Sequence, residues 1–120
     1  MSPELDRLAG ELTDVIDTVA AAFGVPADRT VNGELDCDPT RPGHLRCHQY
    51  GVRLEHPDEP DRRLTEILPA LTGQGWQPHD RSTSREQITR FTREGADFTV
   101  HVARSGQAVA IIGSTRPLPA

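Results

Sequence analysis

Lysine is absent from this sequence of 120 residues, and all 13 basic residues are arginine. Aromatic residues are also few: one Trp, one Tyr and three Phe. Proteins that bind single-stranded nucleic acid need aromatic platforms in a basic groove, whereas this chain has a net charge of -5. No apolar run approaches the roughly 18 residues of a membrane-spanning helix. The sequence therefore argues against a nucleic-acid partner and predicts no membrane span.

Recognisable catalytic motifs are missing as well. No serine lies in a Gly-x-Ser-x-Gly turn, and no glycine-rich loop precedes a helix. The histidines His56, His79 and His101 have no nucleophile or carboxylate beside them at a spacing that suits general base catalysis. We therefore predict that the protein is not an enzyme and needs no cofactor.

The length of the chain fits one domain. We predict a single domain over residues 1–115 and a flexible tail over residues 116–120, which contain Pro117 and Pro119. Residues 1–66 carry 14 acidic residues and 7 Arg, a net charge of 7 − 14 = −7, whereas residues 67–120 carry 4 and 6, a net charge of 6 − 4 = +2. The two halves therefore differ in charge.

Apolar residues recur at the three-four spacing of an amphipathic helix in two segments. The first is residues 3–23, before the helix-ending Gly24, and its apolar residues include Leu5, Leu8, Leu12, Ile16, Val19 and Phe23. The second is residues 60–72, where Leu64, Ile67, Leu68 and Leu71 form the apolar side. Pro69 lies inside this second segment and predicts a kink or an early end, because proline removes a helical hydrogen bond.

Extended segments are predicted where the apolar residues alternate. Residues 45–56 have this pattern, and Gly51, next to a change of phase, predicts a bulge. The other expected strands are residues 31–37, 76–81, 86–93, 97–103 and 107–114, and the last of them is apolar on both faces, as in a central or covered strand. The fold class is therefore α+β, in the order helix, strand, helix, β-meander: two helices packed on one face of an antiparallel sheet of three to five strands.

Cys37 and Cys47 lie on either side of a segment that contains Pro and Gly. They are candidates for a local disulfide, and two free thiols are the other possibility. A zinc-binding domain is a minor alternative, with Cys37, His44, Cys47 and His48 as ligands. The spacing is unlike that of structural zinc sites, because Cys47 and His48 are adjacent and would face opposite sides of a strand. We therefore predict a disulfide or two free thiols, and not a metal site, at these residues.

Arginine is concentrated around the predicted meander, where five residues fall in or beside strands. Arginine is favoured at the energetic centres of protein interfaces. The candidates for partner binding are Arg81, Arg85, Arg90, Arg93 and Arg104.

Several short motifs follow one another between residues 37 and 115. They are Tyr50 to Val52, a Leu-rich helix from Leu64 to Leu71, Gly75-Trp76, a polar hairpin from Phe91 to Val102, and Gly113-Ser114-Thr115. In this order the chain resembles small actinobacterial lipoprotein-like domains of unknown function. It departs from them in lacking a lipobox cysteine and a signal sequence. The resemblance implies the outline of a fold and no activity.

These observations predict a soluble, acidic, non-enzymatic module that binds another protein. Its most concrete form is a toxin-neutralising immunity-type protein, which blocks a basic active site by charge and shape. The alternative is an envelope, lipoprotein-like domain that binds a small ligand or lipid between the first helix and the sheet, with Cys37 and Cys47 oxidised. The first ten residues show no secretory signal, which predicts a cytoplasmic location. A leader outside this sequence would instead place the protein in the cell envelope.

Overall fold

The computed structural model describes residues 3–38, 40–105 and 107–119. These residues form two helices and one seven-stranded antiparallel sheet, which confirms the α+β class. In chain order the elements are α1 (Pro3–Ala22), β1 (Ala27–Asp36), β2 (Leu45–Glu55), α2 (Pro60–Gly73), β3 (Gln77–Asp80), β4 (Glu86–Arg93), β5 (Ala96–Ala103), β6 (Ala108–Thr115) and β7 (Leu118–Pro119).

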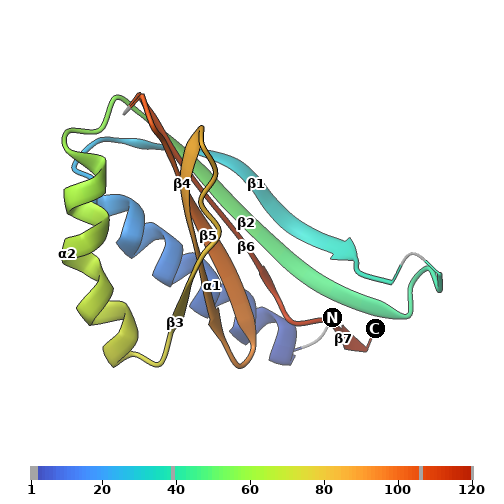
Figure 1. Ribbon diagram of the computed structural model, residues 1–120. Coiled ribbons are helices and arrows are strands. Elements are labelled where there is room, and N and C mark those ends of the chain that lie inside the picture. The colour runs from blue at the N-terminus through green and yellow to red at the C-terminus, as the bar shows by residue number, and fades with distance from the viewer. Residues whose placement is uncertain (1–2, 39, 106, 120) are drawn as a thin grey trace.

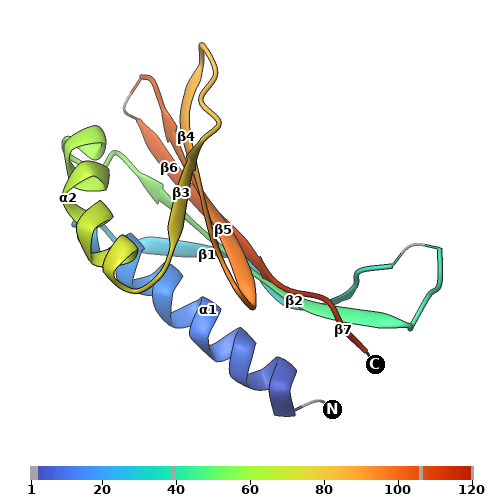
Figure 2. The ribbon, with the colours of Figure 1, turned by 60° about the horizontal axis from the view of Figure 1, so that its bottom comes forward.

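The strands lie in the order β1-β2-β6-β5-β4-β3, and β7 pairs with the outer end of β2. The pairing of β2 with β6 joins the hairpin near the N-terminus to the meander near the C-terminus. Both helices lie on the same side of the sheet, and the long β1–β2 hairpin extends beyond them (Figures 1 and 2). The fold is therefore two layers, helices on a sheet, with the other face of the sheet uncovered by any described element.

α1 forms because its apolar residues fall on one side, and that side is buried against the sheet. Leu12 and Ile16 are fully buried there. Gly24 ends the helix with a φ of 76°, a backbone conformation that favours glycine. The Arg63 guanidinium then donates hydrogen bonds to the backbone oxygens of Ala22, at 3.1 Å, and of Asp58, at 2.8 Å. This one side chain thus holds the end of α1 next to the start of α2.

Aromatic rings form the centre of the core between the layers. Phe98 in β5 stacks on Phe91 in β4, and its ring also meets Trp76 edge to face, with ring centroids 4.9 Å apart in both pairs. Such pairs contribute about 0.5–1.5 kcal/mol each beyond the area they bury. The core therefore connects the meander to the residue that precedes β3.

α1 comes very close to the sheet at Gly113 in β6. A Cβ atom at this position would lie 2.6 Å from the backbone oxygen of Asp97, 2.7 Å from Cβ of Phe98 and 2.9 Å from Cδ1 of Leu12. Glycine is therefore required here for close packing between neighbouring strands and the helix.

Five expectations about the strands and the second helix were wrong. The sheet has seven strands and not three to five, and two of them, not one, lie between the helices. The first strand begins at Ala27 rather than at residue 31. The irregularity expected at Gly51 lies opposite it, in β1, where the register shifts between Arg29 and Val31. The early end that Pro69 allowed is wrong, because α2 continues to Gly73, and an exposed proline near the end of a helix removes only one hydrogen bond.

The C-terminal residues also differ from expectation. Leu118 and Pro119 form β7, which pairs with Leu45 and Arg46, whereas a flexible tail was predicted. Leu118 is buried against Leu5 and Leu8 of α1, so apolar burial holds the tail in place. Residue 120 lies outside the described residues. In the part of the chain that the structure describes, no helix has the length and apolar character needed to cross a membrane.

Candidate functional site

The side of the sheet that faces away from the helices is the candidate functional site, and we call it the open face. Its described residues include Val31, Leu35, Gln49, Ile88, Arg90, Asp97, Thr99, His101, Ala110 and Ile112. Leu35 and Ile112 are the large hydrophobic side chains recorded as exposed among the described residues, at 36% and 38%. Both belong to this face, so its apolar surface is available for contact.

Polar and charged side chains on the open face pair with one another. Arg90 donates a hydrogen bond to Asp97 at 2.9 Å, and Nδ1 of His101 lies 3.4 Å from a carboxylate oxygen of Glu86. Arg53 and Glu55 form a third pair at 2.6 Å, and this hydrogen bond holds the pKa of Glu55 below its usual value. The open face thus combines apolar side chains with polar and charged side chains that are paired with one another.

One end of the open face is hollow. The depression has a volume of about 470 Å³, and its lining includes Cys37, Cys47, Arg90, Asp97 and Ser114. Volumes of roughly 300–1,000 Å³ are typical of sites that hold small ligands. The open face is therefore concave at this end, beside the disulfide.

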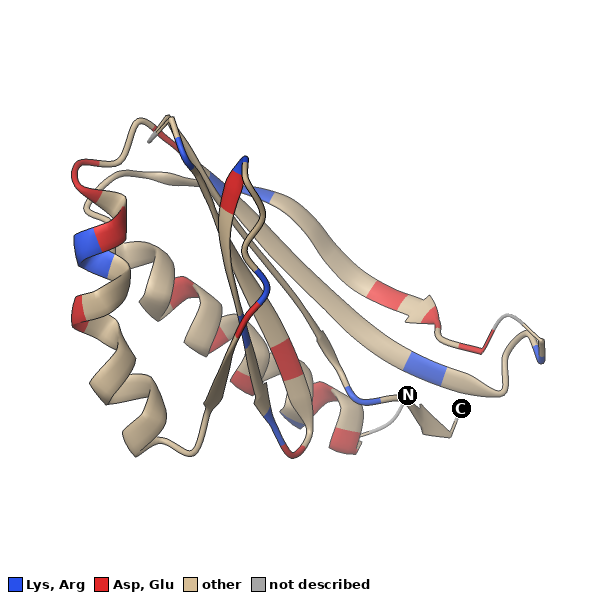
Figure 3. Cartoon of the chain, in the orientation of Figure 1, with Lys and Arg blue, Asp and Glu red and all other residues tan. Residues whose placement is uncertain are grey.

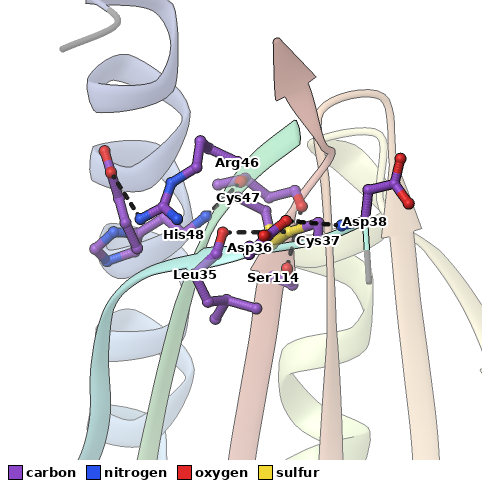
Figure 4. Close-up of a disulfide and its surroundings, with 10 residues drawn as sticks. Leu35, Asp36, Cys37, Asp38, Arg46, Cys47, His48 and Ser114 are labelled. Carbon is purple, nitrogen blue, oxygen red and sulfur yellow. Dashed lines mark hydrogen bonds and ion pairs between the residues drawn. A yellow bond between two sulfur atoms is a disulfide. The ribbon is translucent and has the colours of Figure 1, made fainter. Parts of the chain in front are cut away.

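Cys37 and Cys47, which line part of this hollow, form a disulfide (Figure 4). The two Cα atoms are 6.0 Å apart, and the bond ties the residue after β1 to β2. Beyond it, the carboxylate of Asp36 accepts hydrogen bonds from the backbone N–H groups of Asp38 and Gly43. The hydroxyl of Thr40 donates to Asp38 and lowers the pKa of that carboxyl. The loop at this end is therefore held by covalent and polar contacts.

The zinc alternative has no ligand set in this arrangement. Cys37 and Cys47 are consumed by the disulfide, and Nε2 of His48 lies 2.8 Å from the side-chain oxygen of Asn32. The backbone N–H of His44 donates to the oxygen of Arg41 in the loop. Across residues 3–38, 40–105 and 107–119, no three His, Cys, Asp or Glu side chains are placed to hold a metal ion together.

Basic residues are spread over several helices and strands (Figure 3), and the five candidate arginines do not form one surface. Arg85 and Arg104 lie together at one end of the sheet, where the backbone N–H of Arg104 donates to the oxygen of Arg85. The backbone N–H of Arg81 donates instead to the oxygen of Ile88 in β4. Arg90 lies on the open face and pairs with Asp97. Arg93 lies on the opposite side, with its guanidinium 4.3 Å from the centre of the Trp76 ring. The alternation of residues along β4 separates the last two.

Sequence reasoning did not identify the open face as a site. The sequence signal that could have revealed the open face was the last expected strand, residues 107–114. This strand is apolar on both faces and was expected to be central or covered. β6 is central, between β2 and β5, but only its helix side is covered. Ile111 is fully buried, whereas its neighbour Ile112 is exposed.

Comparison of the chain with protein-family models, with curated proteins and with solved structures found no match. The resemblance of residues 37–115 to lipoprotein-like domains therefore stays a prediction. The fold class is α+β, and the function has to be argued from the surfaces of the molecule.

Proposed function

We propose that this chain is a non-enzymatic protein-binding module that docks its partner on the open face of the sheet. The single observation that carries the proposal is the presence of both exposed large hydrophobic residues, Leu35 and Ile112, on a face that no described element covers. The centres of protein interfaces are apolar and poor in unpaired charge, with polar groups around them. The ion pairs Arg90–Asp97 and Arg53–Glu55 suit this pattern.

The partner is a protein with a basic surface around an apolar contact. The net charge of -5 attracts a basic partner over a distance, which speeds association. Contact itself then rests on apolar burial around Ile112 and on a side chain that fills the hollow beside the disulfide. The most concrete form of this function is a toxin-neutralising immunity-type protein that covers a basic active site.

The test compares two arginine substitutions that change the net charge equally. Ile112→Arg places a charge in the middle of the open face, and Thr65→Arg places one on exposed α2, in the other layer. Partners are captured from the organism that encodes the chain, and the dissociation constant of each purified partner is measured with all three forms. We expect Ile112→Arg to weaken binding by at least about 2 kcal/mol, roughly thirtyfold, as at the centre of an interface. Thr65→Arg should bind like the wild type.

A partner that binds Ile112→Arg as tightly as the wild type would contradict docking on the open face. The immunity-type form has its own test, which is co-expression of the captured partner with the chain. A toxic partner should become harmless with the wild type and with Thr65→Arg, but not with Ile112→Arg. Equal toxicity in the presence and absence of the chain would overturn the immunity-type function.

A further inference from the structure

A covalent bond holds the outer end of β1 on the open face. Cys37, the residue after β1, is bonded to Cys47 in β2, and Cys47 is the partner of Leu35 across the β1–β2 ladder (Figure 4). Side chains alternate between the two faces of a strand, so Leu35, Cys37 and Cys47 share the face of Gln49. The disulfide is therefore next to one of the two exposed large hydrophobic residues of the open face.

Apolar burial does little to hold this end of β1. The structure describes all ten residues of β1, none of them is buried, and residues 34–36 are exposed. The polar contacts there are exposed as well: Arg46 lies 3.5 Å from Glu34, and the Asp36 carboxylate accepts hydrogen bonds from the loop that follows. Exposed polar pairs contribute little to stability, because water competes for the same groups. The disulfide is therefore the main restraint on the position of Leu35.

The bond can be reached from the hollow of the open face. Cys37 is half-buried, Cys47 is 4% exposed, and both line the hollow of about 470 Å³. A thiolate cleaves a disulfide by attacking one of its two sulfur atoms, and the rate depends on access to that sulfur. Attack is therefore expected at Sγ of Cys37, the more exposed residue, with Cys47 as the leaving group.

We propose that this disulfide is a redox site that controls docking: a dithiol reduces it, and the freed end of β1 then moves Leu35 from its place on the open face. One thiolate of the dithiol bonds to Sγ of Cys37 and displaces the Cys47 thiolate. The second thiolate of the dithiol attacks the dithiol's own sulfur in this mixed disulfide and displaces the Cys37 thiolate. The two cysteines take up the two protons that the dithiol lost, and the dithiol is oxidised to a cyclic disulfide. The effect on binding rests on the proposed function, because Leu35 matters only if the partner docks on the open face.

The first experiment follows the release of β1 without a partner. The full chain is treated with dithiothreitol, and the order parameters of its backbone amides are measured by ¹⁵N NMR relaxation. Reduction should lower the order parameter of Leu35 from the rigid value of about 0.85 to below about 0.6. Val100, which is fully buried in β5, should stay near about 0.85 and so shows that the sheet remains folded. The double variant Cys37→Ser/Cys47→Ser should have the mobile Leu35 without any reductant.

The second experiment measures the dissociation constant of a partner that has been captured and purified on the oxidised wild type. Dithiothreitol should weaken binding about tenfold, as expected for the loss of one well-packed apolar contact. Leu35→Ala removes the same contact by truncation, so its oxidised form should lose a similar amount. Reduction of Leu35→Ala should then weaken binding by no more than about twofold, because two changes to one contact are not additive.

The double serine variant also controls for an effect of the reductant on the partner. It has no bond to reduce, so it should bind the partner equally with and without dithiothreitol. Mass spectrometry after alkylation shows that both thiols of the wild type are formed. A bond that dithiothreitol does not reduce in the folded chain, or a Leu35 order parameter that reduction leaves unchanged, would overturn the redox site.

Control of docking through Leu35 has its own refuting results. They are equal binding by the oxidised and reduced wild type, or an equal loss on reduction in the wild type and in Leu35→Ala. Failure of the proposed function is a different result, namely Ile112→Arg binding as tightly as the wild type. In that case the release of β1 on reduction is still decided by the NMR experiment, which needs no partner.

Discussion

Substitution of Gly113 by alanine tests the packing of α1 on the sheet. The new Cβ would lie 2.6 Å from the backbone oxygen of Asp97 and 2.7 Å from Cβ of Phe98. Neither atom can move by a side-chain rotation, so the strands or the helix must shift. Overpacking of a core costs typically about 1–3 kcal/mol, and the backbone contact places this variant at the upper end, about 3 kcal/mol. With an unfolding entropy of about 0.25 kcal/mol/K for 120 residues, Tm should fall by about 12 °C.

Gly33→Ala is the matched control, because it is the same substitution in another strand. No heavy atom lies within 4 Å of a Cβ at Gly33 in β1. Alanine there should stabilise the fold by about 0.5 kcal/mol, since it reduces the freedom of the unfolded chain. Urea denaturation followed by circular dichroism measures both changes. A Gly113→Ala variant within 0.5 kcal/mol of the wild type, or a Gly33→Ala variant that is equally destabilised, would refute the reasoning.

Three other substitutions test further features. Replacing Cys37 and Cys47 together by serine should cost about 2–3 kcal/mol in urea denaturation, as expected when a loop this short is opened, and a reductant should then affect only the wild type. Asp38 has a pKa below 3.8, so its ionised form stabilises the fold at neutral pH and this stabilisation is lost as the pH falls through the lowered value. Asp38→Asn should therefore make the urea midpoint less dependent on acid pH, and an unchanged dependence would contradict the Thr40 contact. Ile112→Arg should leave the free energy of unfolding within about 0.5 kcal/mol of the wild type, and a larger loss would mean that the open face is covered.

The local spacing of apolar residues predicted the helices and strands that bury one of their sides. The spacing of the apolar residues from Leu5 to Phe23 predicted α1, because a helix that packs on a sheet needs apolar residues every three or four positions. Alternation of Phe98, Val100 and Val102 gave β5 in the same way, and all three are fully or almost fully buried.

β1 was harder to predict because it is an edge strand. Most of its side chains are exposed, so no alternation marks its start at Ala27. β7 depends on contacts distant in sequence, between Leu118 and α1 and between Pro119 and Leu45. Elements that are held mainly by distant partners leave little signal in a local sequence.

The candidate sites depend on which face of the sheet the helices cover, and the local sequence does not specify this. Ile111 and Ile112 have the same chemistry, and only the placement of both helices on one side buries the first and exposes the second. Trp76 is almost fully buried. The groove of about 390 Å³ beside it is lined by residues of both α1 and α2, so it depends on tertiary packing and not on helical period.

The register shift in β1 affects how the molecule behaves at high concentration. β1 lies at the edge of the sheet, and a long regular edge is a template on which another chain adds a strand. The shift between Arg29 and Val31 breaks the even spacing of backbone donors and acceptors, so an incoming strand cannot stay in phase with both halves. Exposed Asp28, Glu34 and Asp36 would also repel the same residues of a second copy. Fibril-like stacking through this edge is therefore discouraged by the backbone itself.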